Sequence, residues 1–247
     1  ALAMGYAVAK RLGKIPVVAG VCDGFIGNRI LARYREAADT LLIDGCTPWD
    51  IDAAMVDFGY AMGPYEAQDL SGLDIAHANR RRQDDTRNSA RRYIPIADHV
   101  VAAGRLGRKT GAGWYQYPVN GSKKIDPVIE TMILQAAAAA GINRRAFTQC
   151  DIQKRLVLAM VNEAANILFE GIAATAADVD LVMVHGYGFP RWRGGLLHYA
   201  DQIGVDRLLV MLRMCASEDP CVWHPSPVII DCAEAKISLA DWRAENH

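Results

Sequence analysis

The sequence predicts a mainly α-helical protein in which one helical unit occurs twice in tandem. Apolar residues recur at intervals of three and four along most of the 247-residue chain, which is the spacing of amphipathic helices. Prolines stand where such segments would begin, at positions 48, 64, 95 and 127. A set of landmarks also appears twice in the same order. The composition, 51% hydrophobic and 22% charged, is typical of a globular protein.

Residues 1–24 differ from the rest, because they predict one helix followed by one strand. Apolar positions at Leu2, Tyr6, Ala9 and Leu12 have helical spacing, and Gly13 would end the helix. Residues 15–21 have the β-branched density of a short buried strand. Almost everything downstream is predicted to be helical.

The first helical unit is expected at residues 25–120. A long amphipathic helix would follow Asp23-Gly24 and end near Gly45, which stands where a C-cap is expected. Thr47 and Asp50 would then cap a helix that begins with Pro48. Residues 104–121 are rich in glycine and predict a loop that leads into a short extended aromatic segment at 114–117.

The second unit is expected at residues 148–247, after a linker helix within 121–147. Six landmarks of the first unit return in it with small insertions and deletions, which indicates a tandem duplication. The paired landmarks are Glu36-Ala37-Ala38-Asp39 and Glu163-Ala164-Ala165-Asn166, Gly45 and Gly171, Thr47-x-x-Asp50-x-Asp52 and Thr175-x-x-Asp178-x-Asp180, Gly59-Tyr60 and Gly186-Tyr187, Pro64 and Pro190, and Asp69-x-x-Gly72 and Asp201-x-x-Gly204.

Duplicated units of this kind usually pack about a pseudo-two-fold axis, as a fused dimer would. We therefore expect residues 25–117 and 148–240 to form two similar units. Each would bury an apolar stripe, which is Ile26, Ile30 and Tyr34 in the first and Leu156, Met160 and Ile167 in the second.

Charge and motif content exclude several classes of function. A net charge of -1 gives no electrostatic basis for a nucleic-acid partner, and no apolar run approaches the length of a membrane span. The six histidines and six cysteines have no zinc-site spacing, so no metal is expected. Thiols without CxxC pairs fit a reducing compartment, and the cytoplasm is the predicted location. No G-x-S-x-G elbow supports a hydrolase.

Three clusters have both a functional and a structural interpretation. The stretch from Gly104 to Gly113 is similar to a phosphate loop, but Arg108 replaces the required glycine, so a structural loop supporting Trp114 and Tyr115 is favoured. The arginines between Arg80 and Arg92 could contact the phosphates of coenzyme A or form a solvated surface. The aspartate pairs 50/52 and 178/180 fit helix capping better than a catalytic dyad.

Asn28 is the one candidate site residue. It lies in Gly24-Phe25-Ile26-Gly27-Asn28-Arg29, where a glycine turn leads into the first turn of the long helix. An amide at this position can point back toward whatever precedes the strand, but an isolated asparagine there is more often a local cap.

These motifs resemble the C-terminal part of 3-hydroxyacyl-CoA dehydrogenases over essentially the whole chain. The segments that carry the resemblance are Leu12-Gly13-Lys14-Ile15-Pro16-Val17-Val18, Gly24-Phe25-Ile26-Gly27-Asn28-Arg29-Ile30, Met62-Gly63-Pro64-Tyr65-Glu66, Asp69-Leu70-Ser71-Gly72-Leu73-Asp74, Gly107 to Tyr117, Gly186-Tyr187-Gly188-Phe189-Pro190 and Arg193-Gly194-Gly195. The two-repeat form is similar to multifunctional fatty-acid oxidation proteins, which also carry an enoyl-CoA hydratase/isomerase part.

The resemblance implies a helical fold like the C-terminal domain of 6-phosphogluconate dehydrogenase, and a role in the NAD-dependent oxidation of 3-hydroxyacyl-CoA to 3-ketoacyl-CoA in fatty-acid β-oxidation. It implies that residues 1–24 are the end of a Rossmann domain, and that NAD and the proton-abstracting His/Glu pair belong to that upstream domain. Asn28 matches the family asparagine that holds the substrate and the catalytic histidine. The equivalent position in the second repeat is near Lys154, so that copy lacks the amide.

Two interpretations follow for the chain as a whole. The first is the substrate-side and pseudo-dimerisation region of an oxidoreductase, inactive alone and a monomer or weak dimer. The second is a stand-alone helical binding or scaffold module. The start at Ala1 without an initiator Met, together with a helix-strand unit that has no neighbouring strand, favours the first.

Overall fold

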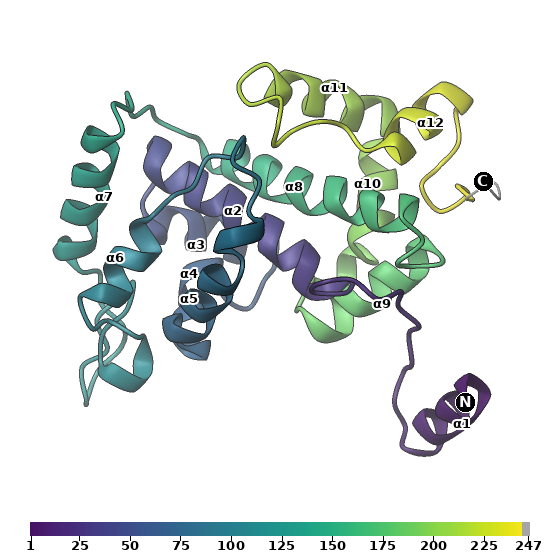
Figure 1. Ribbon diagram of the computed structural model, residues 1–247, viewed down its shortest axis with the longest axis horizontal. Helices are drawn as coiled ribbons and strands as arrows, with labels where there is room; N and C mark the ends of the chain where they lie inside the picture. Colours follow the sequence, from purple (N-terminus) through teal and green to yellow (C-terminus); the bar gives the residue numbers. More distant parts are fainter. Residues whose placement is uncertain (244–247) are drawn as a thin grey trace. The chain divides into compact units, whose positions relative to one another are not determined.

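The computed structural model describes residues 1–243 and is built from α-helices, as the sequence predicts (Figure 1). The helices in this part of the chain are α1 (Leu2–Arg11), α2 (Gly27–Asp44), α3 (Pro48–Phe58), α4 (Pro64–Ser71), α5 (Leu73–Arg82), α6 (Ile96–Ala102), α7 (Pro127–Ala139), α8 (Gln149–Phe169), α9 (Ala176–Gly186), α10 (Leu196–Ile203), α11 (Val205–Ala216) and α12 (Pro227–Ala235). Three short 3₁₀ helices lie between these α-helices in the described part of the chain, which are η1 (Asp84–Thr86), η2 (Arg108–Thr110) and η3 (Arg191–Arg193).

The chain divides into two compact units that interleave in sequence. Unit 1 contains Ala1–Leu31, Met160–Met214 and Pro225–His247, of which 244–247 lie outside the described residues. Unit 2 contains Ala32–Ala159 and Cys215–His224. The boundary between the units therefore falls within both long helices, α2 and α8. Neither unit consists of one continuous copy of the repeat.

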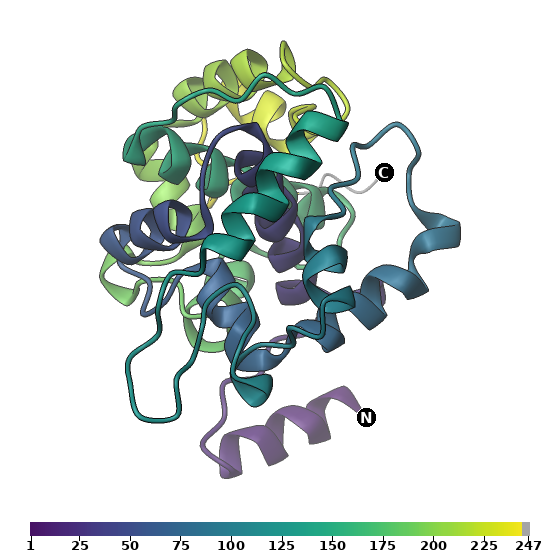
Figure 2. The same ribbon diagram turned by 90° about the vertical axis from the view of Figure 1, so that its left-hand side faces the viewer.

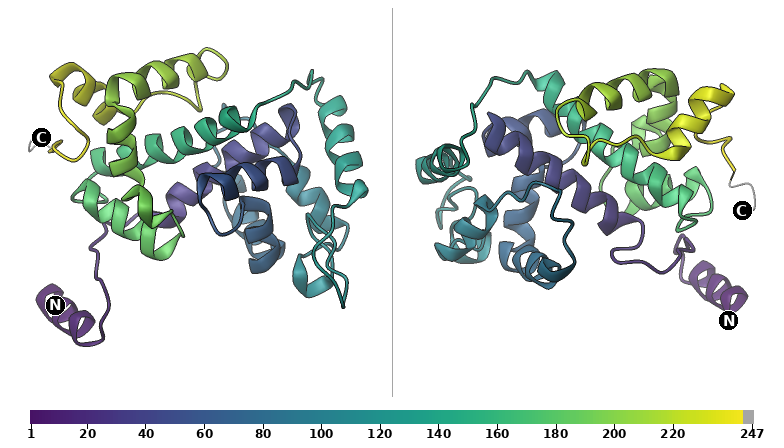
Figure 3. Two further views of the ribbon diagram at one scale, coloured as in Figure 1. Left: turned by 180° about the vertical axis from the view of Figure 1, so that it is seen from behind. Right: turned by 45° about the horizontal axis from the view of Figure 1, so that its top comes forward.

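The expected strand at residues 15–21 is not formed, so this prediction is wrong, although α1 forms as predicted. A strand exists only through ladder hydrogen bonds to a neighbour, and β-branched residues alone do not supply them. Within this segment the Gly20 N–H donates to the carbonyl of Ile172 at 2.8 Å, and a single such bond does not make a ladder. Helix α1 has no buried residue, and it stands apart at the end of the purple trace (Figure 3).

The helix starts follow from the predicted capping residues. The Thr47 side chain accepts from the Asp50 N–H while the Asp50 carboxylate accepts from the Thr47 N–H, which is a capping box at α3. Thr175 and Asp178 form the same box at α9. Asp126 caps α7, which begins at Pro127 inside the expected linker.

Asp52 and Asp180 correct the sequence prediction, because each caps the following helix and not its own. Asp52 accepts from the Tyr65 and Glu66 N–H groups at 2.9 Å, in the first turn of α4. Asp180 accepts from the N–H groups of Leu197 and His198 at 2.7 and 3.1 Å, in the first turn of α10. Both carboxylates thus satisfy orphan donors of the next helix.

Equivalent glycines complete this motif in both repeats. A Cβ on Gly63 would lie 2.3 Å from the Asp52 Oδ1 atom, and one on Gly195 would lie 2.3 Å from the Asp180 Cγ atom. Gly63 and Gly195 are therefore the equivalent N-caps of α4 and α10. The landmark pairing of Pro64 with Pro190 is wrong, because Pro64 is the first residue of α4 whereas Pro190 precedes η3.

A third pair of aspartates ties each repeat to an extended segment downstream. Asp69 accepts from the Trp114 and Tyr115 N–H groups at 2.9 and 3.0 Å. Its counterpart Asp201 accepts from the N–H groups of residues 239 and 240 at 2.7 and 3.1 Å. Three pairs of carboxylates with matching backbone partners, 50/178, 52/180 and 69/201, show that these aspartate landmarks hold equivalent structural positions.

The predicted apolar stripes of both long helices are buried. Ile26, Ile30 and Tyr34 are at most 5% exposed, and Leu156, Met160 and Ile167 at most 1%. At about 25 cal/mol per Å² of apolar surface, such side chains each contribute roughly 1.5–3 kcal/mol to folding. The side chains that the sequence pattern selects therefore form part of the core.

Candidate functional site

The turn before α2 places Asn28 by a local backbone constraint. Gly24 has a φ of +82°, in the left-handed region that favours glycine, and Phe25 follows at +49°. The Gly24 carbonyl accepts from the Arg29 N–H at 3.3 Å, so the turn closes on the first turn of α2. The sequence motif thus delivers Asn28 as the second residue of α2, as predicted.

Asn28 is exposed, and its amide oxygen is held by the second repeat. The hydroxyl of Tyr187 donates to the Asn28 Oδ1 atom at 2.8 Å. Tyr187 is the C-cap residue of α9 and belongs to the Gly186-Tyr187 landmark. The Nδ2 group of Asn28 makes no hydrogen bond with the described part of the chain, so it is free to donate.

Gly27 explains how the Tyr187 ring reaches α2. A Cβ on Gly27 would lie 1.9 Å from the Tyr187 Cε2 atom and 2.3 Å from its Cζ atom, far inside the ordinary contact distance of about 3.5–4.0 Å. The phi angle of Gly27 is not in the left-handed region, so backbone strain does not require glycine here. The close approach of the ring does.

Arg29 anchors the same turn to α8 and to the residue that follows it. Its Nε donates to Glu163 at 2.5 Å, and its two terminal nitrogens donate to Glu170 at 2.5 and 2.6 Å. Glu163 is 7% exposed. The hydrogen bonds with Glu170 raise the pKa of Arg29 above its usual value, and those with Arg29 lower the pKa of Glu170. Because two carboxylates compensate its charge, Arg29 positions the turn and does not present a free cation to a ligand.

The corresponding part of the second repeat has a different chemistry. Lys154 is exposed, and the neighbouring Arg155 donates to Glu218 at 2.7 Å. The Gln153 amide donates to the Ala54 carbonyl at 2.8 Å. This end of α8 is therefore engaged in structural contacts, as expected for a copy without the amide.

The glycine loop at 104–113 holds a side chain of the protein itself. A Cβ on Gly107 would lie 2.3 Å from the Asp69 carbonyl oxygen, and one on Gly113 would lie 1.9 Å from the Asp69 Oδ1 atom. Asp69 also accepts from the Tyr117 hydroxyl at 2.9 Å, and burial raises its pKa. The space of a phosphate is thus filled by a carboxylate, and the structural interpretation of this loop is confirmed. Figure 2 shows the segment between α6 and α7 in teal.

This arrangement also bears on a dinucleotide cofactor. Binding of a pyrophosphate requires a glycine turn between a strand and a helix N-terminus. The loop at 104–113 leads into η2, a 3₁₀ helix of three residues, and Asp69 fills it. The residues of this loop therefore do not fit NAD.

The arginine cluster is mostly neutralised by carboxylates. Arg80 pairs with Asp98 at 2.7 Å, and Arg87 pairs with Asp84 at 2.6 Å. Three more of these arginines form ion pairs, which are Arg81 with Asp84, Arg91 with Glu36 and Arg92 with Asp44. The structure favours the solvated ion-pair surface over a cradle for coenzyme A phosphates.

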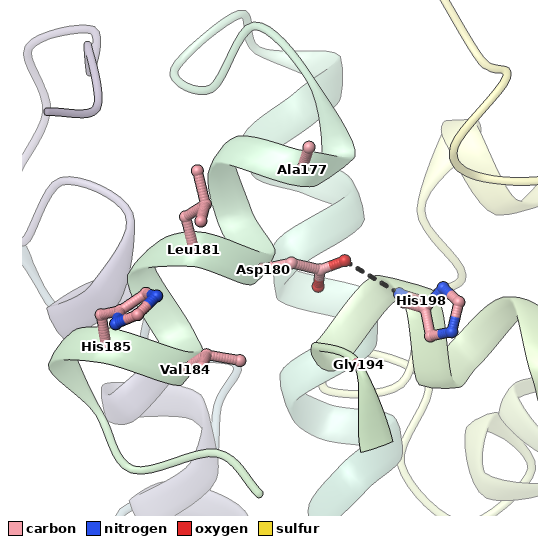
Figure 4. Close-up of a pocket in the computed structure, with 7 residues that line it drawn as sticks. All are labelled: Ala177, Asp180, Leu181, Val184, His185, Gly194 and His198. Atoms are coloured by element: carbon pink, nitrogen blue, oxygen red, sulfur yellow. Dashed lines mark hydrogen bonds between the residues drawn. The ribbon is translucent and has the colours of Figure 1, made fainter. Parts of the chain in front are cut away.

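A cavity of about 350 Å³ lies between α9 and α10 in unit 1 (Figure 4). The Asp180 carboxylate faces it but accepts from the His198 N–H, so its charge is used in capping α10. The His198 Nε2 atom lies 3.0 Å from the amide of Gln202. The described residues contain no group of three or more His, Cys, Asp or Glu side chains that could hold a metal ion.

Comparison with known proteins identifies the family. The model of the 3-hydroxyacyl-CoA dehydrogenase C-terminal domain matches residues 24–117 and again 152–237. The chain belongs to this family. The resemblance stated from the sequence is confirmed.

The curated relatives that this chain matches are longer proteins than the chain itself. The chain is 40% identical over 244 residues to a peroxisomal bifunctional enzyme of Danio rerio, with 93% of this chain and 34% of that protein covered. It is 38% identical to the peroxisomal bifunctional enzyme of Homo sapiens, with 89% and 32% covered. It is 33% identical to a fatty acid oxidation complex subunit alpha of Pseudomonas putida, with 95% and 33% covered. The chain thus spans about a third of the length of these relatives.

Two solved structures share the fold. The dehydrogenase part of multifunctional enzyme 1 from C. elegans has a TM-score of 0.71 at 24% identity and covers 93% of this chain and 52% of its own. The 3-hydroxybutyryl-CoA dehydrogenase of Escherichia coli has a TM-score of 0.71 at 21% identity, and the match covers 93% of this chain and 63% of that chain. In the described residues, no helix is both long and apolar enough to span a bilayer.

Proposed function

We propose that this chain is the substrate-side helical region of an NAD-dependent 3-hydroxyacyl-CoA dehydrogenase of fatty-acid β-oxidation, with Asn28 as its site residue. The observation that carries the proposal is an exposed amide whose oxygen is held at 2.8 Å by Tyr187 while its Nδ2 group stays open. A local cap would direct this side chain to backbone N–H groups of its own helix. Here it is held instead by a residue 159 positions away.

The role proposed for Asn28 is positioning. Its amide would bind an oxygen of the 3-hydroxyacyl-CoA or 3-ketoacyl-CoA, or orient the catalytic histidine of an upstream Rossmann domain. The His/Glu pair and the NAD site are assigned to that domain, since the glycine loop of this chain does not fit the dinucleotide. The chain alone is therefore proposed to be inactive.

The organisation proposed for the chain keeps the boundaries expected from the sequence. Residues 1–24 would complete the NAD-binding domain, 25–120 and 148–247 would be the two repeats about a pseudo-two-fold axis, and 121–147 would link them. The exposed apolar side chains of α1 and its C-cap residue, including Leu2, Met4 and Leu12 at 62–72%, support an additional domain as its partner. The isolated chain is proposed to be a monomer or weak dimer, and the cytoplasm remains the location predicted from its thiols.

A chimera tests this function. The chain would replace the matching segment of the Danio rerio enzyme, and acetoacetyl-CoA reduction would be followed through the consumption of NADH. We expect turnover by the chimera and none by the chain alone above a control without protein. A folded but inactive chimera beside an active parent enzyme would contradict the proposal, and so would turnover by the chain alone.

A further inference from the structure

We propose that Tyr187 is a positioning residue that fixes the Asn28 amide so that its Nδ2 group, a hydrogen-bond donor, faces the ligand. This inference rests on the proposed function of Asn28. It adds a second residue, Tyr187, and states that the group facing the ligand is a hydrogen-bond donor. Its basis is the contact between two motifs that lie in different repeats, the Gly27-Asn28-Arg29 turn and the Gly186-Tyr187 landmark.

The hydrogen bond to Tyr187 shows which way the Asn28 amide faces in the structure. A side-chain amide has one oxygen that accepts and one NH₂ group that donates twice. The hydroxyl hydrogen of Tyr187 goes to the Asn28 Oδ1 atom at 2.8 Å, which is an ordinary O–H···O distance. A flipped amide would instead donate from its NH₂ group to the Tyr187 oxygen and present its own oxygen outward, whereas in the structure the Oδ1 atom is the one that meets the hydroxyl. The group that Asn28 presents outward is therefore the donor, and its ligand must offer an acceptor oxygen.

The position of the ring is itself fixed. Gly27 permits the ring of Tyr187 to lie against the first turn of α2, because the site of a Gly27 Cβ atom is only 1.9 Å from the ring. Arg29 holds the same turn on its other side through Glu163 and Glu170. An amide on a rigid turn, held by a packed tyrosine, loses little conformational entropy when it binds a ligand.

The repeats give a matched comparison for this role. The C-cap position that Tyr187 holds on α9 is held on α3 by Gly59, so the sequence pairing of Tyr187 with Tyr60 is wrong by one residue. Tyr60 follows Gly59, and its ring stacks with Tyr34 and Phe58 at centroid distances of 6.1 and 6.2 Å. The first repeat thus uses its nearby tyrosine for aromatic packing. The second repeat, whose own position near Lys154 lacks an amide, supplies the tyrosine that serves Asn28.

Substitutions at both positions separate the donor role from general packing. Tyr187→Phe keeps the ring against Gly27 and removes only the hydroxyl, while Tyr60→Phe is the control. A net hydrogen bond of about 0.5–1.5 kcal/mol corresponds to a fall in kcat/KM of roughly 2- to 12-fold in the chimera. The same change in an Asn28→Ala background should alter kcat/KM less than about 2-fold, because Tyr187 acts through Asn28. Asn28→Asp can still accept from Tyr187 but has no donor, so it should lose as much activity as Asn28→Ala.

Independent effects of Tyr187→Phe and Asn28→Ala, or an active Asn28→Asp enzyme, would overturn the inference while leaving the role of Asn28 intact. An Asn28→Ala enzyme with full activity would instead contradict the proposed function. A second measurement uses the chain itself, through the NMR order parameter of the Asn28 side-chain amide. We expect it to be rigid and to become as mobile as the exposed amide of Asn120 in Tyr187→Phe. Equal mobility of the Asn28 amide in the unsubstituted chain and in Tyr187→Phe would also overturn the inference.

Discussion

Substitution of Gly27 by alanine tests the contact between α2 and α9 that forms the candidate site. The new Cβ would lie 1.9 Å from the Tyr187 Cε2 atom and 2.7 Å from its hydroxyl oxygen. The ring would have to move by roughly 1.5–2 Å to restore a van der Waals contact. A shift of that size breaks the 2.8 Å hydrogen bond to Asn28.

The expected cost follows from opposing contributions. The lost hydrogen bond is worth about 0.5–1.5 kcal/mol, and the displaced ring loses packing of about 1–2 kcal/mol. Alanine is favoured over glycine inside a helix by up to about 1 kcal/mol, which offsets part of this loss. We therefore expect Gly27→Ala to lower the free energy of unfolding by about 1–3 kcal/mol.

A double-mutant cycle measured by urea unfolding isolates the contact. In a Tyr187→Ala background the overlap is gone, so Gly27→Ala should be neutral or stabilising by up to about 1 kcal/mol. A coupling of at least about 1.5 kcal/mol would support the geometry. The same cost of Gly27→Ala in both backgrounds would refute it, because the cost would then come from the backbone or from another neighbour.

Three further perturbations address the carboxylates of the fold. Asp69→Asn weakens an acceptor of three donors and should lower the free energy of unfolding in urea by about 2–4 kcal/mol. Asp201 accepts from two backbone donors, so Asp201→Asn should lower it less, and equal losses would contradict the bond count. Arg29→Leu leaves the buried Glu163 without this cation and should lower the free energy of unfolding by about 2–4 kcal/mol. Lys236→Ala removes an exposed pair with Asp206 and should change it by less than about 0.5 kcal/mol. Similar effects of the two variants would mean that burial is unimportant. Burial raises the pKa of Asp39 to about 6, so its stabilising contribution is complete below about pH 4 and is lost as the pH rises through 6. Asp39→Asn can still accept from the Tyr65 hydroxyl. Unfolding across this pH range should therefore show the variant gaining about 2–3 kcal/mol relative to the parent at pH 7 compared with pH 4, and a constant difference would contradict the raised pKa.

Local chemistry made most of the helices predictable from the sequence. Thr47 and Thr175 mark helix starts because their hydroxyls satisfy N–H groups three residues on, which requires no tertiary information. The strand predicted at 15–21 does not form, because a strand depends on a neighbour that a propensity cannot supply. The roles of Asp52 and Asp180 were only half visible, since a carboxylate at a helix start suggests capping but does not reveal which helix it caps.

The candidate site was predictable only in part. The glycine turn located Asn28 in the first turn of a helix, but its partner Tyr187 lies 159 residues away and could not be inferred from spacing. Two signals were present in retrospect. Gly27 is a glycine in a helical conformation, which indicates a close neighbour, and Gly186-Tyr187 is a landmark shared by both repeats. The Arg29–Glu163–Glu170 cluster gave no local signal, because charged residues on helices usually face solvent.

The most direct test of the proposed role of this chain is the kcat/KM of Asn28→Ala in the chimeric enzyme, measured with acetoacetyl-CoA and NADH. Asn166→Ala, at an asparagine of α8, is the control. We expect kcat/KM to fall by about 10- to 1,000-fold, or about 1.4–4 kcal/mol, for Asn28→Ala and not for the control. Asn28 is exposed and not part of the core, so the variant should stay folded at the assay temperature and lose no more stability than the one hydrogen bond to Tyr187, about 0.5–1.5 kcal/mol. Full activity of Asn28→Ala, or a loss that a melting curve attributes to unfolding, would show that Asn28 is only a local structural residue and would contradict the proposed function.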